Sequence, residues 1–373
     1  MCKPDIPYIN LIYELGLEKN LKSSFTKMRY FIHNRLYPWG SPVELLRFPL
    51  LNIIDKFRYA LHIIYSKNLK EWKRLDKITA HEWLIKWLGE KGYKILWEQA
   101  IDLKFGDYSK DISAAWLWSR IRRVGNSRKN LFREELYYLN GGTHLLIETL
   151  RDKIIKSGGN IYLNNPVKKL RNAKKLEIWD GFNNKYQFDF VISTIPMAAL
   201  SKIIYDFSED YKKKISGIKY LGVVCAIIEL AEPFSEYFWL NISNKDIPLA
   251  GIIEYTNLNP IDIKDRKNII YIPLYVENSS ALFRKDKDLV FEYIVKYLSK
   301  IKPDFNIKYV KNYDVFKTKL AQPVCERNFL KKIPDMNKVV DGFIAADTSF
   351  YYPEDRSVSE SINLGKKLAK LVK

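Results

Sequence analysis

In the first 134 residues, apolar positions recur mostly at the three-to-four-residue spacing of a helix. Ser41 precedes a proline and, three positions on, a glutamate, a pattern that favours the start of a helix. Thr79 begins a second start signal, a capping box, ahead of another apolar run. Residues 57–65 are apolar on more than one side, which predicts a packed helix. A short apolar run followed by His-Asn predicts a hairpin within residues 29–37.

The pattern changes after residue 134. A short apolar run reaches Gly141-Gly142, and the helical stretch that follows is closed by Gly158-Gly159. Alternating positions then predict short strands in a meander, at 161–163, 167–170, 176–179 and 186–188. Residues 189–194 form an apolar run that stops at Ile195-Pro196, which predicts a strand buried on both faces.

The remainder of the chain mixes strands and helices. The pattern predicts a helix at 289–297 and strands at 223–230, 252–256 and 269–275. The last part predicts a strand at 342–346 and a terminal helix that begins at Ser357. The expected fold therefore combines α/β and α+β elements, with changes of pattern near residues 134, 200 and 332.

Composition excludes several classes of protein. Of the 373 residues, 47% are apolar, which is enough for substantial cores and argues against a disordered chain. No run approaches the roughly 18 apolar residues of a membrane span. The three cysteines and four histidines are scattered without metal-ligand spacing, so no metal is expected. An apolar signal region is also missing from the first residues, and we expect a cytoplasmic protein.

The chain carries a formal charge of +19. Its lysines and arginines are spread over every segment and stand beside apolar helical positions, as on solvated helix faces. We therefore expect no nucleic-acid partner. Attraction to an anionic membrane surface, as a peripheral contact, or to an anionic metabolite stays open, because charge alone does not separate them.

Several separated motifs together resemble one family. They are Gly141-Gly142 with its helix, Gly158 to Ile161, Asn165-Pro166-Val167, Asp189 to Pro196, Gly342 to Ala346 and Tyr352 to Arg356. In this order they resemble the flavin-containing amine oxidase and protoporphyrinogen oxidase superfamily. Ile253 to Asn257 and Ala321 to Val324 are similar to its bacterial branch associated with polysaccharide biosynthesis, near the UDP-galactopyranose mutases.

The resemblance implies an FAD-binding doubly wound domain built from discontinuous segments, here incomplete, with a helical lobe and a mixed-sheet substrate domain. On this basis residues 1–134 are the helical part of a substrate or cap domain. Residues 135–200 and 333–373 are segments of the FAD-binding domain. Residues 201–332 are the part of the substrate domain that contains a β-sheet.

The resemblance also implies cofactor-binding residues. Val167 would contact the adenine through its backbone, Thr194 to Pro196 would lie near the adenosine half, and Asp347 near the ribityl chain or pyrophosphate. Ser357 and Val358 would face the isoalloxazine, where a helix N-terminus and the Arg356 cation favour an anionic ring edge. The full implied set is Gly141, Gly142, Val167, Thr194, Pro196, Ala346, Asp347, Arg356, Ser357 and Val358. No spacing identifies a catalytic residue.

Ordinary structural roles compete with these assignments. The glycine pair fits a strand-to-helix turn that needs positive φ. Val167 fits a plain strand position, and Asp347 with Arg356 fits a surface pair. The aromatic residues fit core packing as well as a substrate cavity; they are Trp116, Trp118, Tyr255 and Tyr275.

One expected element is missing. Members of the family open with a strand, a GxGxxG turn and a helix that hold the FAD pyrophosphate, and none of the sixteen glycines here forms that motif. Ala346 and Ser357 also stand where relatives commonly have glycine. Three explanations compete: a misassigned start, a separate chain that supplies the dinucleotide unit, and a remnant that no longer binds FAD.

The leading prediction is an FAD-dependent oxidoreductase that transfers hydride from a small-molecule substrate to the flavin. The first alternative is a flavin-dependent protein similar to sugar-nucleotide mutases, whose diphosphate substrate would suit the basic charge. The second alternative is a non-catalytic interaction module that offers a sheet edge to a partner chain.

Overall fold

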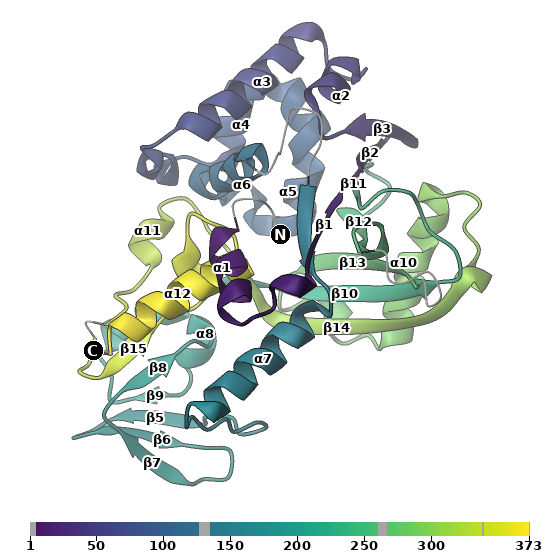
Figure 1. The fold of residues 1–373 in the computed structure, drawn as a ribbon. Coiled ribbons are helices and arrows are strands. Elements are labelled where there is room, and N and C mark those ends of the chain that lie inside the picture. The colour runs from purple at the N-terminus through teal and green to yellow at the C-terminus, as the bar shows by residue number, and fades with distance from the viewer. Residues whose placement is uncertain (1–4, 127–134, 260–266, 338, 373) are drawn as a thin grey trace. The chain divides into compact units, whose positions relative to one another are not determined.

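The computed structural model describes residues 5–126, 135–259, 267–337 and 339–372 (Figure 1). These residues form two compact units, each built from discontinuous segments. The first unit contains Lys22–Tyr138 and Tyr220–Arg327. The second unit contains Asp5–Leu21, Leu139–Lys219 and Asn328–Lys373. The predicted division at residues 134, 200 and 332 stays a prediction.

A seven-stranded mixed sheet is the centre of the first unit. Its order is β14-β10-β13-β12-β11-β2-β3. All neighbouring strands are antiparallel except β11 and β2, which run parallel. The strands span Met28–Ile32 (β2), Arg35–Trp39 (β3), Tyr220–Leu230 (β10), Trp239–Ser243 (β11), Gly251–Glu254 (β12), Asn268–Val276 (β13) and Val310–Pro323 (β14).

The sheet core forms because β10 alternates between fully buried and half-buried residues. Helix α10 (Lys287–Ile301) supplies Val290, Ile294 and Leu298 to the same cluster of buried side chains, so it covers this face of the sheet (Figure 1). The strands predicted at 223–230, 252–256 and 269–275 and the helix at 289–297 are confirmed within one to four residues at their ends. The pattern missed β11 and β14. The exposed and polar residues of β14 explain why it was missed, whereas β11 does alternate between half-buried and buried residues.

Local signals position the remaining elements of this unit. His33 and Asn34 have positive φ between β2 and β3, which confirms the hairpin. Ser41 Oγ accepts a hydrogen bond from the Glu44 amide, and Thr79 with Glu82 forms the reciprocal capping box. The other elements are β1 (Leu21–Phe25), paired with β4 (Glu135–Leu139), and the helices α2 (Pro42–Arg47), α3 (Ile53–Asn68), α4 (Ala80–Tyr93), α5 (Gln99–Phe105) and α6 (Ala114–Asn126).

The second unit has a small parallel pair beside a four-stranded sheet. Strands β8 (Val191–Ser193) and β15 (Phe343–Ala345) form the pair, and the sheet has the order β7-β6-β5-β9. The remaining strands are β5 (Lys169–Asn172), β6 (Leu176–Trp179), β7 (Lys185–Phe188) and β9 (Ile204–Tyr205). The helices are α1 (Ile6–Glu14), α7 (Gly142–Lys156), α8 (Met197–Leu200), α9 (Glu209–Ser216), α11 (Phe329–Lys332) and α12 (Val358–Lys370).

Two predictions in the second unit are wrong. Residues 161–163 form no strand, and Tyr162 and Leu163 are 75% and 76% exposed. The strand predicted at 189–194 shortens to β8, where Ile192 is 41% exposed and not buried on both faces. A parallel strand needs neighbours and cover on both faces, whereas β8 pairs with β15 alone among the described residues. These segments thus have more apolar side chains than the described residues bury.

Candidate functional site

The carboxyl ends of β8 and β15 meet at one edge of the second unit. The strands run parallel with Ser193 opposite Ala345, and the Ala346 amide donates to the Ser193 carbonyl at 3.0 Å. In open α/β sheets, ligands bind outside the carboxyl ends of the strands. The loops that follow β8 and β15, which contain Thr194–Pro196 and Ala346–Asp347, therefore define the candidate site.

Asp347 ties these two loops together. Its Oδ2 accepts a hydrogen bond from the Met197 amide at 2.8 Å. Its Oδ1 accepts from the amide and hydroxyl of Ser349 at 2.9 and 2.6 Å. The carboxylate is buried, so Asp347 does not belong to a surface pair. It sets the backbone after both strands, including Pro196 at the N-cap position of the short helix α8.

Ala346 lies inside the protein. Its side chain is fully buried in a cluster with Ile344 of β15 and Leu368 of α12. The methyl group at this position is therefore a core contact between the end of the strand and the terminal helix. Gly342 at the start of the same strand has a φ of +72°, and a Cβ there would lie 2.1 Å from the Asp189 carbonyl oxygen. This glycine allows β8 and β15 to approach.

Helix α12 begins at the next predicted group of residues. Ser357 Oγ accepts a hydrogen bond from the Glu360 amide at 3.2 Å, so this side chain caps the helix. Val358 is exposed in the first turn, and Arg356 is half-buried just before it. The other amides of the first turn give this helix end a positive partial charge, to which Arg356 adds and which Glu360 of the same turn reduces. Amides at such an end can donate to an anionic group.

Gly141, Gly142 and Val167 lie on other elements. Gly141 and Gly142 have φ values of +93° and +67° between β4 and α7, and a Cβ on Gly141 would come within 3.0 Å of the Leu145 side chain. The strand-to-helix turn requires these glycines whether or not a flavin lies nearby. Val167 is exposed and precedes β5 instead of opening it.

The loop before Val167 is held by Asp180. The Asn165 side chain donates to Asp180 at 3.0 Å and accepts from the Gly181 amide at 3.1 Å. Burial raises the pKa of Asp180, but hydrogen bonds from Asn165, Asn184 and Phe182 outweigh it and bring the pKa to about 2. The Asn-Pro-Val motif thus has a structural role that the sequence alone did not reveal.

The motif at 253–257 also proves to be structural. Glu254 is buried, and its carboxylate accepts hydrogen bonds from the amides of Phe234 and Ser235 at 2.9 and 2.7 Å. Burial raises the pKa of Glu254, although these hydrogen bonds act against the rise. Asn257 donates to the carbonyls of Ser235 and Tyr237, both at 3.0 Å. The motif fixes the loop before β11.

Aromatic side chains of the first unit form a cluster around one cation. Lys104 Nζ lies 4.7 Å from the ring centre of Trp116 and 5.0 Å from that of Tyr275. A cation over aromatic faces is stabilised by the ring quadrupoles. Trp118 is fully buried and donates to the Ser66 carbonyl at 2.7 Å, which confirms core packing for this residue.

Sequence reasoning missed two partners of the site. They are the Met197 amide and Ser349, which share the Asp347 carboxylate. An aspartate two residues before a serine is typical of an Asx turn, so the sequence does indicate the contact with Ser349. Met197 lies 150 residues before Asp347 in the chain, and no local pattern indicates that contact. Among the described residues, no group of His, Cys, Asp or Glu is arranged to hold a metal.

Comparisons with known proteins agree with this fold. The family of flavin containing amine oxidoreductases matches residues 2–319, and the chain belongs to that family. The comparison with curated proteins found no match. No helix in the described ranges is long and apolar enough to cross a membrane.

Solved structures share the mixed α/β fold at low identity. A protein assigned as a protoporphyrinogen oxidase from Exiguobacterium sp. 255-15 has a TM-score of 0.74 and 13% identity, over 100% of this chain and 86% of that one. Putrescine oxidase with bound putrescine has a TM-score of 0.70 and 14% identity, with the same coverage. Reduced UDP-galactopyranose mutase has a TM-score of 0.64 and 11% identity, over 87% and 72%.

Proposed function

We propose that this chain is the larger part of an FAD-dependent oxidoreductase of the amine-oxidase type, which transfers hydride from a small-molecule substrate to the flavin. Membership of the flavin containing amine oxidoreductase family supports the flavin. The observation that carries the proposal is the Asp347 carboxylate, which joins the loops after two parallel strands where a dinucleotide would bind.

We propose that one part of FAD lies against described residues of the second unit. Thr194 and Pro196 follow β8 and would border the adenosine half, while Asp347 holds the loop that would face the ribityl chain. Arg356, Ser357 and Val358 begin α12, whose positive end would meet the pyrimidine edge of the isoalloxazine. Bound FAD would supply the hydride acceptor. This chain's own residues would position it and exclude water.

The diphosphate of FAD needs a further segment. Residues 1–373 contain no GxGxxG turn, and a turn of that type holds the diphosphate at a helix N-terminus. The second unit also leaves apolar side chains exposed on β8 and next to it in the chain: Phe190, Ile192 and Ile195. We propose that a strand–GxGxxG–helix segment outside residues 1–373, on a separate chain if need be, covers these side chains and completes the site.

The visible absorption spectrum tests both parts of the proposal. The purified chain is incubated with FAD, alone and with a strand–GxGxxG–helix segment supplied as a separate polypeptide, and unbound cofactor is removed. We expect a protein-perturbed flavin spectrum in the completed protein, and anaerobic bleaching when an oxidisable amine such as putrescine is added. A completed protein without flavin, or with flavin that no donor reduces, would refute the oxidoreductase and favour a remnant.

A matched pair of variants locates the site. Asp347→Asn removes one acceptor from the junction of the two loops, and we expect the completed protein to retain less flavin. Asp341→Asn changes an exposed carboxylate six residues earlier and should leave retention unchanged. Equal retention in both variants would move the cofactor away from this edge.

A sugar-nucleotide mutase-like activity is the second candidate. The charge of +19 and the fold shared with UDP-galactopyranose mutase favour it. In that case the flavin returns to its starting state in each cycle. Protection of the reduced protein by a sugar nucleotide, with no net consumption of reductant during turnover, would support this alternative over the oxidoreductase.

A further inference from the structure

Helix α3 of the first unit exposes an apolar side, although it also buries polar residues and packs aromatic ones on its other sides. His62 and Ser66 are completely buried. On the opposite side, Ile53 and Phe57 are 70% and 64% exposed. The helix predicted at residues 57–65 is confirmed and packs on one side, while Phe57, Leu61 and Ile64 stay exposed on the other. Surface helices normally show the opposite arrangement.

The exposed residues form one continuous stripe. Ile53, Phe57, Leu61 and Ile64 are spaced by four, four and three residues, so they lie on one side of the helix, and Ile54 widens the stripe at its start. The buried side is fixed by hydrogen bonds: Arg58 donates to the Trp87 carbonyl at 2.7 Å. The orientation of the helix is therefore set by α4, and the stripe cannot turn inward without breaking that contact.

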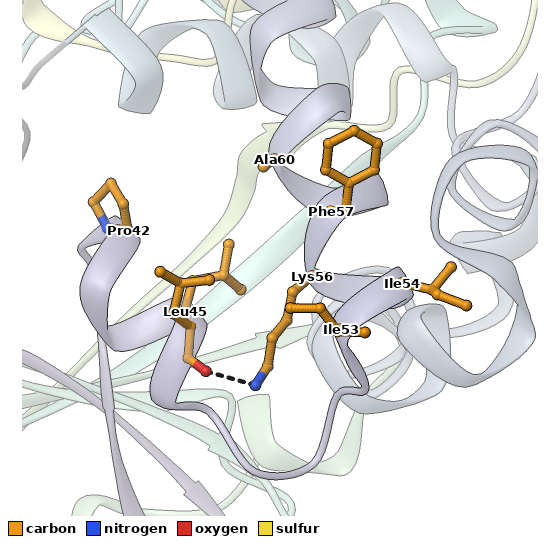
Figure 2. Close-up of a pocket in the computed structure, with 8 residues that line it drawn as sticks. Pro42, Leu45, Ile53, Ile54, Lys56, Phe57 and Ala60 are labelled. Carbon is orange, nitrogen blue, oxygen red and sulfur yellow. Dashed lines mark hydrogen bonds between the residues drawn. The ribbon is translucent and has the colours of Figure 1, made fainter.

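A hollow of about 450 Å³ opens between α2 and α3 at one end of the stripe (Figure 2). Seven of its eight lining residues are apolar: Pro42, Leu45, Leu46, Ile53, Ile54, Phe57 and Ala60. The eighth is Lys56, whose Nζ donates to the Leu46 carbonyl at 2.7 Å; Figure 2 draws this bond as a dashed line from the Lys56 side chain. The hollow therefore offers apolar carbon to an occupant, with a cation at its edge.

The charges around the stripe are mostly positive. Residues 42–68, which contain α2 and α3, have four Lys and Arg against two Asp and Glu. Arg47 ends α2 and Lys67 lies in the last turn of α3, and both are exposed beside the stripe. Glu44, the acidic residue of α2, forms an ion pair with Arg29 at 3.2 Å. The net charge near the apolar face thus has the sign that an anionic surface attracts.

We propose that the exposed face of α2 and α3 binds the surface of an anionic lipid membrane. An amphipathic helix with basic residues beside an apolar stripe lies in the plane of the interface, with its apolar side among the upper acyl carbons. The stripe carries no polar group that would orient a particular protein partner, which favours a fluid apolar phase. Lipid phosphates then meet Arg47 and Lys67, and an acyl chain fits the hollow. This proposal does not depend on the flavin.

Vesicle co-sedimentation tests this inference with the 373-residue chain. We expect binding to phosphatidylcholine vesicles that contain roughly one-third phosphatidylglycerol, and weaker binding to phosphatidylcholine alone or at raised salt. Phe57→Asp should lower the partition coefficient by about tenfold or more, because it removes buried apolar area and adds a repelled charge. The matched control is Phe316→Asp on β14, which replaces a phenylalanine that is 57% exposed and should bind as the unchanged chain does.

Circular dichroism first establishes that both variants keep the fold, and Ile54→Asp serves as a second variant in the stripe. The inference is overturned if the unchanged chain binds no anionic vesicles, or if Phe57→Asp and Ile54→Asp bind as well as Phe316→Asp does. It is also overturned if the unchanged chain forms a dimer that Phe57→Asp disrupts while neither binds vesicles, since the face would then join two copies.

Discussion

The two units of this protein differ in how fully they bury their strands. In the first unit, β10 has a partner on each edge, and Ile228 and Ile272 across the β10–β13 pair are fully buried under α10. In the second unit, β8 pairs with β15 alone in the described part of the chain, and its central Ile192 stays exposed. Antiparallel strands can pair with strands that follow directly after a short turn. Parallel strands are joined by crossover segments, and those segments also cover their faces. Among the described residues, the second unit therefore leaves its parallel pair less covered than the first unit leaves its sheet.

The largest expected change in stability comes from truncating a buried isoleucine, and we compare one isoleucine from each unit. Ile272→Ala should lower the free energy of unfolding of the first unit by about 2–5 kcal/mol, because it leaves a cavity in a packed core. Ile192→Ala should lower that of the second unit by less than about 1 kcal/mol, because the side chain already meets solvent. Urea unfolding separates the units: tryptophan fluorescence reports mainly on the first, since Trp179 is the one tryptophan of the second. Similar losses would contradict the contrast in burial.

A pH dependence is expected for the first unit. Burial lowers the pKa of His62 to about 4, and both ring nitrogens lack a hydrogen-bond partner among the described residues. In the unfolded chain the His62 imidazole binds a proton near pH 6.5, whereas in the folded chain it does so only near pH 4. The stabilising contribution is therefore complete above pH 6.5 and is lost as the pH falls toward 4, by about 3 kcal/mol in all.

His62→Phe should remove this part of the pH dependence, because Phe keeps the ring contacts with Trp83 and Trp87 without a titrating group. His144→Phe is the control, since His144 is exposed on α7. The measurement is urea unfolding at several pH values between 4 and 7. An unchanged pH profile in His62→Phe would refute the assignment.

A smaller effect should follow from Asp347→Asn in the second unit. Asn keeps one oxygen, so either the Met197 amide or the Ser349 group loses its acceptor. We expect a loss of about 1–3 kcal/mol in the free energy of unfolding of the second unit. Hydrogen exchange at the Met197 amide or at the Ser349 amide should accelerate, and Asp341→Asn should leave both unchanged. Unchanged protection of both amides in Asp347→Asn would show that this carboxylate does not hold the two loops.

The smallest expected loss of stability comes from removing a helix cap, and it should be equal in the two units. Ser41 caps α2 in the first unit and Ser357 caps α12 in the second, each by accepting from the amide three residues on at 3.2 Å. Ser41→Ala and Ser357→Ala should each cost about 1 kcal/mol, because a cap depends on local geometry and not on the completeness of the unit. Circular dichroism during urea unfolding measures both. A much larger loss for Ser357→Ala would assign this serine a role beyond capping.

Predictions that rested on local hydrogen bonds agree with the structure. The cap at Ser41, the box at Thr79 and the hairpin turn at His33-Asn34 each involve partners within a few residues, so short sequence windows contain the needed information. Predictions of burial succeeded where the strand and its cover are both present, as in β10. They failed at residues 161–163 and 189–194, where the pattern is that of a covered sheet and the described chain provides no cover.

The candidate site depended on long-range structure. The resemblance pointed to Asp347, Ala346 and Ser357, but it gave no sign that Asp347 bonds the Met197 amide or that the Ala346 methyl packs against α12. The cofactor-binding residues as a group stay a prediction. The missing GxGxxG turn, by contrast, follows from the residues themselves.

Membership of the family, the charge of +19 and the helix caps were available from the order of residues, since composition, motifs and neighbouring hydrogen bonds do not depend on distant parts of the chain. Tertiary structure decided which apolar side chains remain exposed on α3 and β8, and which backbone groups share the Asp347 carboxylate. The physical reason is that burial and long-range hydrogen bonds each need two segments that meet only in the folded chain. A periodic apolar pattern shows that a surface needs cover, and only the folded chain shows whether that cover is present.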